Sequence, residues 1–263
     1  MLKSEQVNYY IQGAEIEVEK YIEQIVEWLR ERTEAAGAKG LLVGVSGGLD
    51  SAVVAALIKK AYPGNSLGVM MPIHTSHKNL QDALEVTNAS NIEAINIDLT
   101  ESHNVMYEQI TEKLNDKKSF NQEQDQLANA NLRARLRMST LYALAAHYNY
   151  LVVGTDNASE WYTGYFTKYG DGGVDILPLV EFTKTEVREM AKLLNVPQAV
   201  IAKVPSADLW EDQSDESEMG VSYTVIDAYL KGETIKEEDK EIIEKMHTRT
   251  MHKRERLPFF KRN

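Results

Sequence analysis

Cysteine is absent from the 263 residues of this chain. Disulfide bonds, thiolate zinc sites and cysteine nucleophiles are therefore excluded. No apolar run approaches the roughly 18 residues that a membrane-spanning helix needs. Residues 1–13 are polar and mixed in charge, unlike a signal peptide. We expect a cytoplasmic protein without a membrane partner.

Positive charge is scarce, since the chain has 29 Lys and Arg residues but 40 Asp and Glu residues, and its formal net charge is −11. An acidic chain repels a phosphate backbone, so no nucleic-acid partner is expected, although a local basic cluster could still bind a small phosphate ligand. Apolar residues make up 43% and charged residues 26%, which is usual for a globular protein. We expect a single domain spanning residues 1–263.

Short apolar runs alternate with segments of helical periodicity through the first part of the chain. This alternation indicates βαβ units, because parallel strands need crossover connections. The expected fold class is α/β, with a doubly wound, mostly parallel sheet flanked by helices. Strands are predicted at residues 41–45, 67–71, 92–97 and 151–154, and helices at residues 14–36, 51–60, 77–88, 101–114 and 126–147.

Three stretches of the sequence lack the periodicity of a helix or a strand. Residues 116–126 are polar and predict a mobile loop. Residues 155–175 are rich in Gly, Tyr, Thr and Asp, and loops of this length are uncommon unless they carry function. Residues 206–219 are acidic and irregular. Helices are predicted at residues 184–195, 222–230 and 237–247, before a basic tail.

A glycine-rich motif lies where the first predicted strand meets the next helix. Two adjacent glycines let the backbone approach an anion, and the helix N-terminus adds N–H groups and a positive dipole end. Asp50 implies Mg²⁺, because a carboxylate beside bound phosphate requires a cation between them. No Lys follows the glycines, and Ser46 replaces the second Gly of GxGxxG, so two common nucleotide motifs are excluded. The motif comprises Gly44, Val45, Ser46, Gly47, Gly48, Leu49, Asp50 and Ser51.

The sequence SGGLDS within this motif resembles the pyrophosphate-binding loop of the N-type ATP pyrophosphatases. Members of that superfamily cleave ATP between its α- and β-phosphates and adenylate a carboxylate or carbonyl oxygen. The resemblance implies that the motif binds ATP. On its own it leaves NAD synthetases, GMP synthetases, asparagine synthetases, tRNA thiolases and lysidine synthases as candidates.

A second motif, in residues 154–175, chooses among these candidates. GTDNASE, followed by GYFTKYGDGGVD, is similar to the signature loop of NAD synthetases. The loop follows a predicted strand, so it lies on the ligand side of the sheet. The resemblance implies that Thr155 contacts ATP, that Glu160 ligates Mg²⁺ with Asp50, and that Lys168 and Asp175 bind the pyridine nucleotide. Asp50, Glu160 and Asp175 are the predicted catalytic residues.

Three further segments resemble the NAD synthetase family. The sequence ARLR matches an arginine-bearing helix of the family and makes Arg135 a predicted contact of the dinucleotide. Lys184 and Ser206, the second in the sequence PSADLW, match residues that contact ATP. His252 and Lys253 match the HKR sequence near the family's C-terminus and are predicted to bind substrate.

This resemblance implies a two-step reaction. ATP, with Mg²⁺, adenylates nicotinate adenine dinucleotide (deamido-NAD), and ammonia then displaces AMP to give NAD. Glutamine-using relatives carry a glutaminase domain with a catalytic cysteine, and this chain has neither. Free ammonia is therefore the expected donor, unless a separate subunit delivers it. The family resemblance also implies a homodimer, which agrees with the two apolar sides of the helix predicted at residues 126–147. GMP synthetase-like amination and a non-catalytic nucleotide sensor remain as alternatives.

Overall fold

The computed structural model describes residues 4–206 and 214–262, with side chains described from residue 17 onward. Its four strands form one parallel sheet in the order β3-β2-β1-β4. The predicted α/β fold with a doubly wound parallel sheet is confirmed. The strands are β1 (Gly40–Gly44), β2 (Ser66–Met70), β3 (Glu93–Asn96) and β4 (Tyr150–Val152).

Strand β1 lies inside the sheet and is covered on both faces. Leu41 and Val43 point into one hydrophobic cluster, and Leu42 points into another. All three side chains are 0% exposed. Because successive side chains of a strand point to opposite faces, an uninterrupted apolar run fits only such a doubly covered position.

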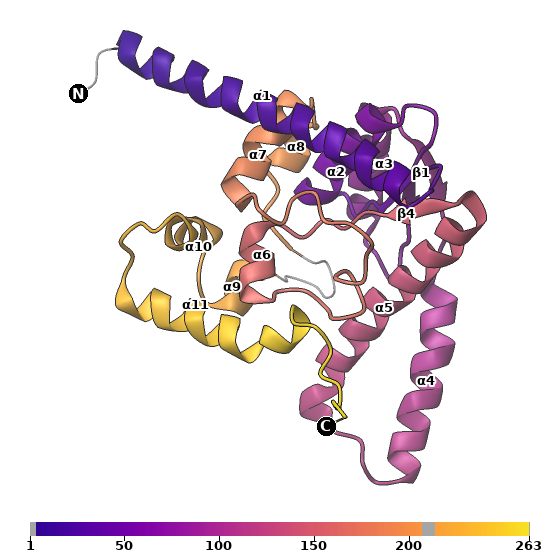
Figure 1. Ribbon diagram of the computed structural model, residues 1–263. Coiled ribbons are helices and arrows are strands. Elements are labelled where there is room, and N and C mark those ends of the chain that lie inside the picture. The colour runs from indigo at the N-terminus through magenta and orange to yellow at the C-terminus, as the bar shows by residue number, and fades with distance from the viewer. Residues whose placement is uncertain (1–3, 207–213, 263) are drawn as a thin grey trace.

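Helices cover the two faces of the sheet unequally (Figure 1). Helices α1, α2, α3 and α7 pack with the larger cluster, whereas α5 covers the opposite face and α4 packs against α5. The chain reverses the direction of strand addition after β3, which places a switch point between β1 and β4. Ligands of open α/β sheets bind at such a point. The helices are α1 (Ser4–Ala35), α2 (Leu49–Ala61), α3 (His77–Ser90), α4 (Thr100–Asp116), α5 (Gln122–Tyr148), α7 (Lys184–Leu193) and the short α8 (Gln198–Ile201).

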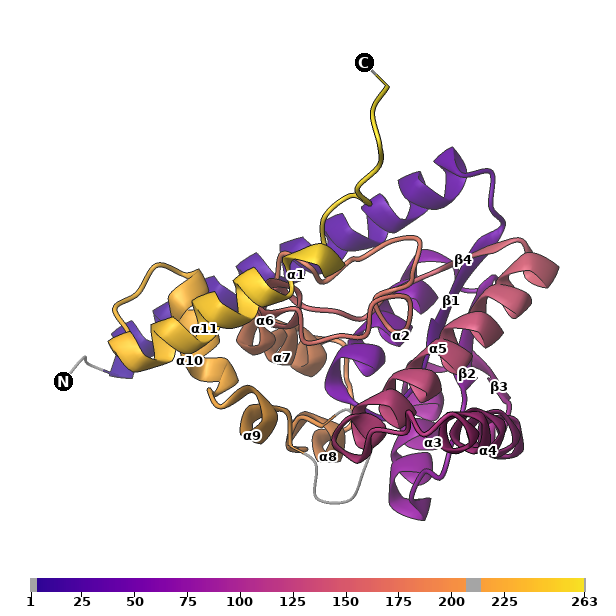
Figure 2. The same ribbon diagram turned by 90° about the horizontal axis from the view of Figure 1, so that it is seen from below.

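A smaller helical layer lies beside the sheet domain (Figures 1 and 2). It has a hydrophobic cluster of its own, with Ile226 and Ile243 fully buried. Helix α6 belongs to this layer and also carries part of the signature loop, so the layer faces the candidate site. Its elements are α6 (Ala158–Thr163), α9 (Asp215–Met219), α10 (Tyr223–Leu230), α11 (Glu237–Arg249) and the 3-10 helix η1 (Met251–Lys253).

The prediction of a mobile loop at residues 116–126 is wrong. Helix α4 continues through Asp116, and α5 already begins at Gln122. The Asn121 side chain accepts a hydrogen bond from the Glu123 backbone N–H at 3.0 Å, and Tyr107 of α4 donates to the Asp125 carbonyl at 3.0 Å. An Asn cap followed by acidic residues favours a helix start, and the polarity of the segment had concealed it.

Two stretches that were predicted to be irregular contain short helices in the structure. The stretch 155–175 is irregular as predicted, but it contains helix α6. The stretch 206–219 contains helix α9, and its residues 207–213 lie outside the described part of the chain. None of the helices within the described ranges is long and apolar enough to span a membrane.

Candidate active site

The glycine-rich motif connects β1 to the first turn of α2. The Ser51 hydroxyl donates to the Gly48 carbonyl at 3.0 Å and accepts from the Ser46 backbone N–H at 3.3 Å. The Ser46 hydroxyl accepts from the Gly48 N–H at 3.2 Å and is exposed. The two serines therefore fix a compact turn at the carboxyl end of β1.

Gly47 is the position in this turn where only glycine fits. Its φ is 79°, in the left-handed region that side chains avoid. A Cβ added there would also lie 2.8 Å from the Ala83 backbone nitrogen and 2.8 Å from the Asp82 Cβ of α3. The turn can follow this path only because residue 47 lacks a side chain.

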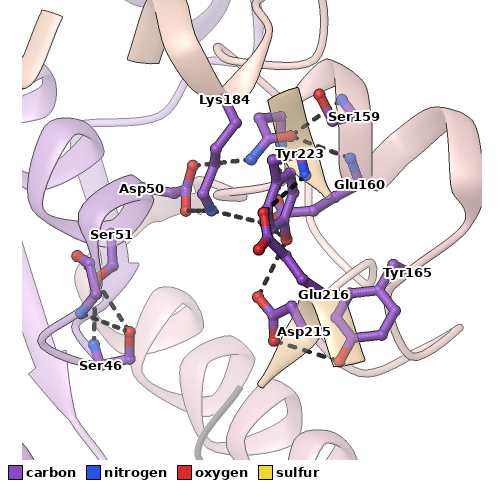
Figure 3. A network of polar contacts seen from close by, with 12 residues as sticks. Ser46, Asp50, Ser51, Ser159, Glu160, Tyr165, Lys184, Asp215, Glu216 and Tyr223 are labelled. Carbon is purple, nitrogen blue, oxygen red and sulfur yellow. Dashed lines mark hydrogen bonds and ion pairs between the residues drawn. The ribbon is translucent and has the colours of Figure 1, made fainter. Parts of the chain in front are cut away.

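Asp50, Glu160 and Lys184 meet at the end of this loop, although they come from α2, α6 and α7 (Figure 3). We call these three residues the cation cluster. The Lys184 Nζ lies 2.6 Å from Asp50 Oδ2 and 3.0 Å from Glu160 Oε1. The Lys184 side chain is 4% exposed, and the carboxylates are 15% and 13% exposed. The structure thus brings together the two predicted magnesium ligands and one of the predicted ATP contacts.

Asn157 holds both carboxylates in place. Its side-chain Nδ2 donates to Asp50 Oδ1 at 3.0 Å, and its backbone N–H donates to Glu160 Oε2 at 3.1 Å. Its own side-chain oxygen accepts from the first N–H groups of α6, which completes a capping box with Glu160. The cap of α6 is therefore also part of the candidate site.

Negative charge dominates the site. Burial raises the pKa of Glu160 to about 7, and Asp50 adds to the rise although Lys184 opposes it. Burial lowers the pKa of Lys184, but Asp50 and Glu160 outweigh this effect and the net pKa is raised. Burial, followed by the neighbouring carboxylates, also raises the pKa of Asp156. A further cation would reduce this repulsion.

The site's chemistry fits a divalent cation shared with a ligand. Asp50 and Glu160 offer hard oxygen donors, and both contact one ammonium group, so they lie close enough for one ion. The buried Oδ2 atom of the neighbouring Asp156 has no hydrogen-bond partner in the described ranges. Among the described residues, no group of three or more Asp, Glu or His side chains forms a metal site. Mg²⁺ typically keeps several waters and is bound by one or two carboxylates together with substrate phosphates.

A second group of predicted residues gathers around the signature loop. We call Arg135, Lys168, His252 and Lys253 the basic cluster. Arg135 donates to the Lys168 carbonyl at 3.3 Å, and the Lys168 ammonium donates to the His252 carbonyl. Lys253 donates to the Gly164 carbonyl at 2.7 Å. The C-terminal residues are thus packed against the loop, and the exposed Arg135 and His252 side chains can reach a ligand.

Three predicted residues lie at the margins of these clusters. Asp175 accepts from the Val152 N–H at 2.8 Å and from the Tyr142 hydroxyl at 3.0 Å, which fixes its carboxylate at the end of β4. Thr155 follows β4 at the same edge of the sheet and is half-buried. Ser206 is exposed at the end of a described range, next to residues 207–213.

Several buried polar residues around the cation cluster were not predicted from the sequence. Tyr223 donates toward Glu160, and Asp215 lies beside the same hydroxyl. Asp227 accepts from Ser159 and Thr185, the neighbours of Glu160 and Lys184. The Asn157–Glu160 cap beside them does have a local sequence signal, an Asn followed three residues later by Glu.

Comparison with known proteins extends the likeness over nearly the whole chain. A model of the NAD synthase family matches residues 21–261. The NH(3)-dependent NAD(+) synthetase of Alkaliphilus oremlandii is 57% identical over 241 residues, covering 92% of this chain and 96% of that protein. A solved NMN synthetase from Francisella tularensis has a TM-score of 0.84 at 41% identity, covering 92% of this chain and 98% of that one. An NH3-dependent NAD synthetase from Campylobacter jejuni has a TM-score of 0.76 at 28% identity, covering 93% and 99%.

Proposed function

The chain belongs to the NAD synthase family, and from this membership we propose which of its residues perform each part of ammonia-dependent NAD synthesis. The enzyme is a ligase that forms a C–N bond. ATP is a substrate, and the amination of a GMP synthetase-like enzyme is not favoured. The observation that carries the residue assignment is the cation cluster at the carboxyl edge of a parallel sheet.

The first step is adenylation of the substrate carboxylate. A pyridine carboxylate does not react with ammonia directly, because its leaving group would be oxide. We propose that the loop from Gly44 to Ser51, whose turn is fixed by its two serines, binds the β- and γ-phosphates of ATP through N–H and hydroxyl groups. Lys184, Thr155 and Ser206 are the further ATP contacts that we propose. No P-loop lysine follows the glycines, so transfer of the γ-phosphoryl group is not expected.

Mg²⁺ is the cation that we propose for Asp50 and Glu160. When bound, it neutralises the charge that develops as pyrophosphate leaves. Asp50 and Glu160 would hold the ion, and Asn157 donates a hydrogen bond to each of the two carboxylates, which orients them. A cation bound in this way would account for two acidic residues beside a phosphate-binding loop.

The substrate carrying the carboxylate is proposed to be deamido-NAD. The exposed Arg135 and the adjoining Lys168, His252 and Lys253 supply positive charge for its phosphates. Asp175 is proposed to contact the pyridine nucleotide and to take part in catalysis. Ammonia then attacks the acyl adenylate, so no side chain becomes covalently attached, and rate acceleration comes from positioning and electrostatics.

We further propose that the enzyme works as a homodimer. Helix α4 exposes three apolar side chains, Val105, Met106 and Ile110, which are 50%, 43% and 42% exposed. Leu127 on the adjacent α5 is 56% exposed. Apolar side chains that stay exposed on two packed helices could be buried against a second copy of the chain. We also propose that the chain forms a single synthetase domain and works in the cytoplasm. Its nitrogen donor is ammonia.

Incubation with ATP, Mg²⁺, ammonium and deamido-NAD, followed by chromatography, tests the function. NAD and AMP are expected in equal amounts. A parallel reaction should replace deamido-NAD by nicotinate mononucleotide, because one structural relative is an NMN synthetase. A higher kcat/KM for the mononucleotide would contradict the proposed substrate, and formation of neither amide would contradict the proposed function.

A further inference from the structure

Tyr223 connects the cation cluster to the helix that follows residues 207–213. Its hydroxyl lies 3.1 Å from Glu160 Oε1 and 3.1 Å from Asp215 Oδ2 (Figure 3). The Lys184 Nζ lies 4.7 Å from the centroid of its ring. One side chain therefore contacts an acidic and a basic member of the cation cluster at once.

The backbone around Tyr223 fixes its orientation. Tyr223 is the first residue of α10 and is 4% exposed. Its backbone N–H donates to Glu216 Oε1 at 2.8 Å, and its side chain belongs to the hydrophobic cluster formed with Met219 and Ile226. A side chain anchored in this way can hold a partner at a defined position, because its own rotamer is set by packing.

Glu160 is held at each of its two oxygens. The Asn157 N–H donates to Oε2 at 3.1 Å, while Tyr223 and Lys184 contact Oε1 at 3.1 Å and 3.0 Å. Removal of the Tyr223 hydroxyl would leave Oε1 with a charged partner but without its second anchor. The carboxylate would then have to be ordered when a cation binds, which weakens binding.

We propose that Tyr223 is a positioning residue that orients the Glu160 carboxylate and the Lys184 ammonium for cation-bound ATP. This inference rests on the proposed function, in which Glu160 ligates Mg²⁺ and Lys184 contacts ATP. Asp215, which is buried at the start of α9, also lies within hydrogen-bond distance of the Tyr165 hydroxyl, at 3.3 Å. Tyr223 thereby links the ATP site to the α9–α10 layer.

Tyr229 provides a matched control in the same helix. Its hydroxyl lies 3.4 Å from the Tyr162 hydroxyl and 3.2 Å from Glu244 Oε1 of α11. It contacts the helical layer and not the cation cluster. Tyr223→Phe and Tyr229→Phe each remove one hydroxyl and keep the ring, so Tyr229→Phe reports the effect of losing a hydroxyl that contacts only the helical layer.

The test is calorimetric titration of ATP into the full chain at a series of Mg²⁺ concentrations, without deamido-NAD or ammonia. In Tyr223→Phe, the Mg²⁺ concentration that gives half-maximal ATP affinity should rise about tenfold, the scale of a lost hydrogen bond to a charged group. In Tyr229→Phe it should stay within about twofold of the parent value. An equal shift in the two variants, or no shift in either, would overturn the proposal.

A double-mutant cycle with Glu160→Gln identifies the residue through which Tyr223 acts. Tyr223→Phe should have less than half of its effect on the Mg²⁺ requirement in the Glu160→Gln background, and an undiminished effect would overturn the proposal. Because these titrations contain no deamido-NAD, their result does not depend on whether the chain forms NAD in the amidation assay. A chain that binds ATP with Mg²⁺ but forms no NAD would refute the proposed function while leaving the role of Tyr223 measurable.

Discussion

Lys184 carries a charge that the fold could not bury alone. Its side chain is 4% exposed, and removal of a lone ammonium group from water would cost several kcal/mol. Contacts of 2.6 Å and 3.0 Å with Asp50 and Glu160 compensate this cost. Since a cation ligated by the same two oxygens would lie near the Lys184 ammonium, the two positive charges compete for these carboxylates unless Lys184 moves toward a phosphate.

Lys184→Met tests this competition. The variant leaves two close carboxylates without their ammonium, so we expect the free energy of unfolding without Mg²⁺ to fall by about 1–3 kcal/mol. Added Mg²⁺ should then stabilise Lys184→Met more than the parent chain, because the ion replaces the lost charge. Thermal melts with and without Mg²⁺ measure both effects. Lys203→Met, which loses contacts with Asn79 and Asp82, is the control. Equal stabilisation of all three chains by Mg²⁺ would contradict the expectation.

At the scale of elements, Asp227 of α10 joins the two helices that carry Glu160 and Lys184. Its carboxylate accepts from the Ser159 hydroxyl at 2.6 Å and from the Thr185 N–H at 2.9 Å. These partners directly precede Glu160 and directly follow Lys184 in the sequence. The spacing between α6 and α7, and with it the geometry of the cation cluster, therefore depends on a third helix.

Asp227→Asn should disturb this junction while preserving the size of the side chain. One amide oxygen cannot accept all three donors that the carboxylate accepts from Ser159 and Thr185. We expect unfolding free energy to fall by about 1–3 kcal/mol and KM for ATP to rise several-fold. Ile226→Val, at the neighbouring fully buried position, should cost about 0.5–1.5 kcal/mol without changing KM. Urea unfolding and steady-state kinetics provide the two readouts. A KM change in Ile226→Val as large as that in Asp227→Asn would argue against a specific role for the junction.

The proposed dimer makes a prediction about helix α4. Ile110→Asp places a charge among the exposed apolar residues, whereas Asn115→Asp adds the same charge at another exposed position of the helix. Burying an unpaired carboxylate in an interface is costly, so Ile110→Asp should shift the protein toward the monomer and Asn115→Asp should not. Light scattering coupled to gel filtration measures the mass. A parent chain that is already monomeric at micromolar concentration would contradict the proposed homodimer.

The elements also show which local signals the sequence contains. The apolar runs of β1 and β2 predicted buried strands within one residue of their observed ends, because a doubly covered strand has a distinctive composition. The beginning of α5 was missed, since capping by Asn121 was hidden in a polar stretch. Helix α6 was missed because six residues are too few for a periodic pattern.

For the whole molecule, the doubly wound parallel sheet and the two motifs at its edge could be predicted, but not the order of the strands or how the smaller helical layer meets the sheet. Asp50 and Glu160 were expected together because of the resemblance to NAD synthetases, and the structure shows that the strands preceding them, β1 and β4, are neighbours. The contacts of Tyr223 with Glu160 and of Asn157 with Asp50 join residues 63 and 107 positions apart. No periodicity or spacing in a single sequence encodes such pairings, which depend on tertiary packing.

The absence of cysteine leads to a prediction about the nitrogen source. A glutaminase of the kind found in glutamine-using relatives needs a cysteine nucleophile, which this chain lacks. Glutamine should therefore not replace ammonium in ammonia-free buffer. The rate with ammonium should increase with pH near neutrality, because NH₃ is the nucleophile and NH₄⁺ is not. Equal rates of NAD formation with glutamine and with ammonium would contradict this expectation.

The most direct test of the central claim is the exchange of labelled pyrophosphate into ATP without ammonia. If the glycine-rich loop holds a departing pyrophosphate while the acyl adenylate forms, label should enter ATP when deamido-NAD and Mg²⁺ are present. Omission of deamido-NAD should abolish the exchange, and so should Asp50→Asn, while Glu244→Gln in α11 should not. With ammonium added, the nucleotide product should be AMP. Appearance of ADP instead of AMP, or exchange that persists in Asp50→Asn, would contradict the account.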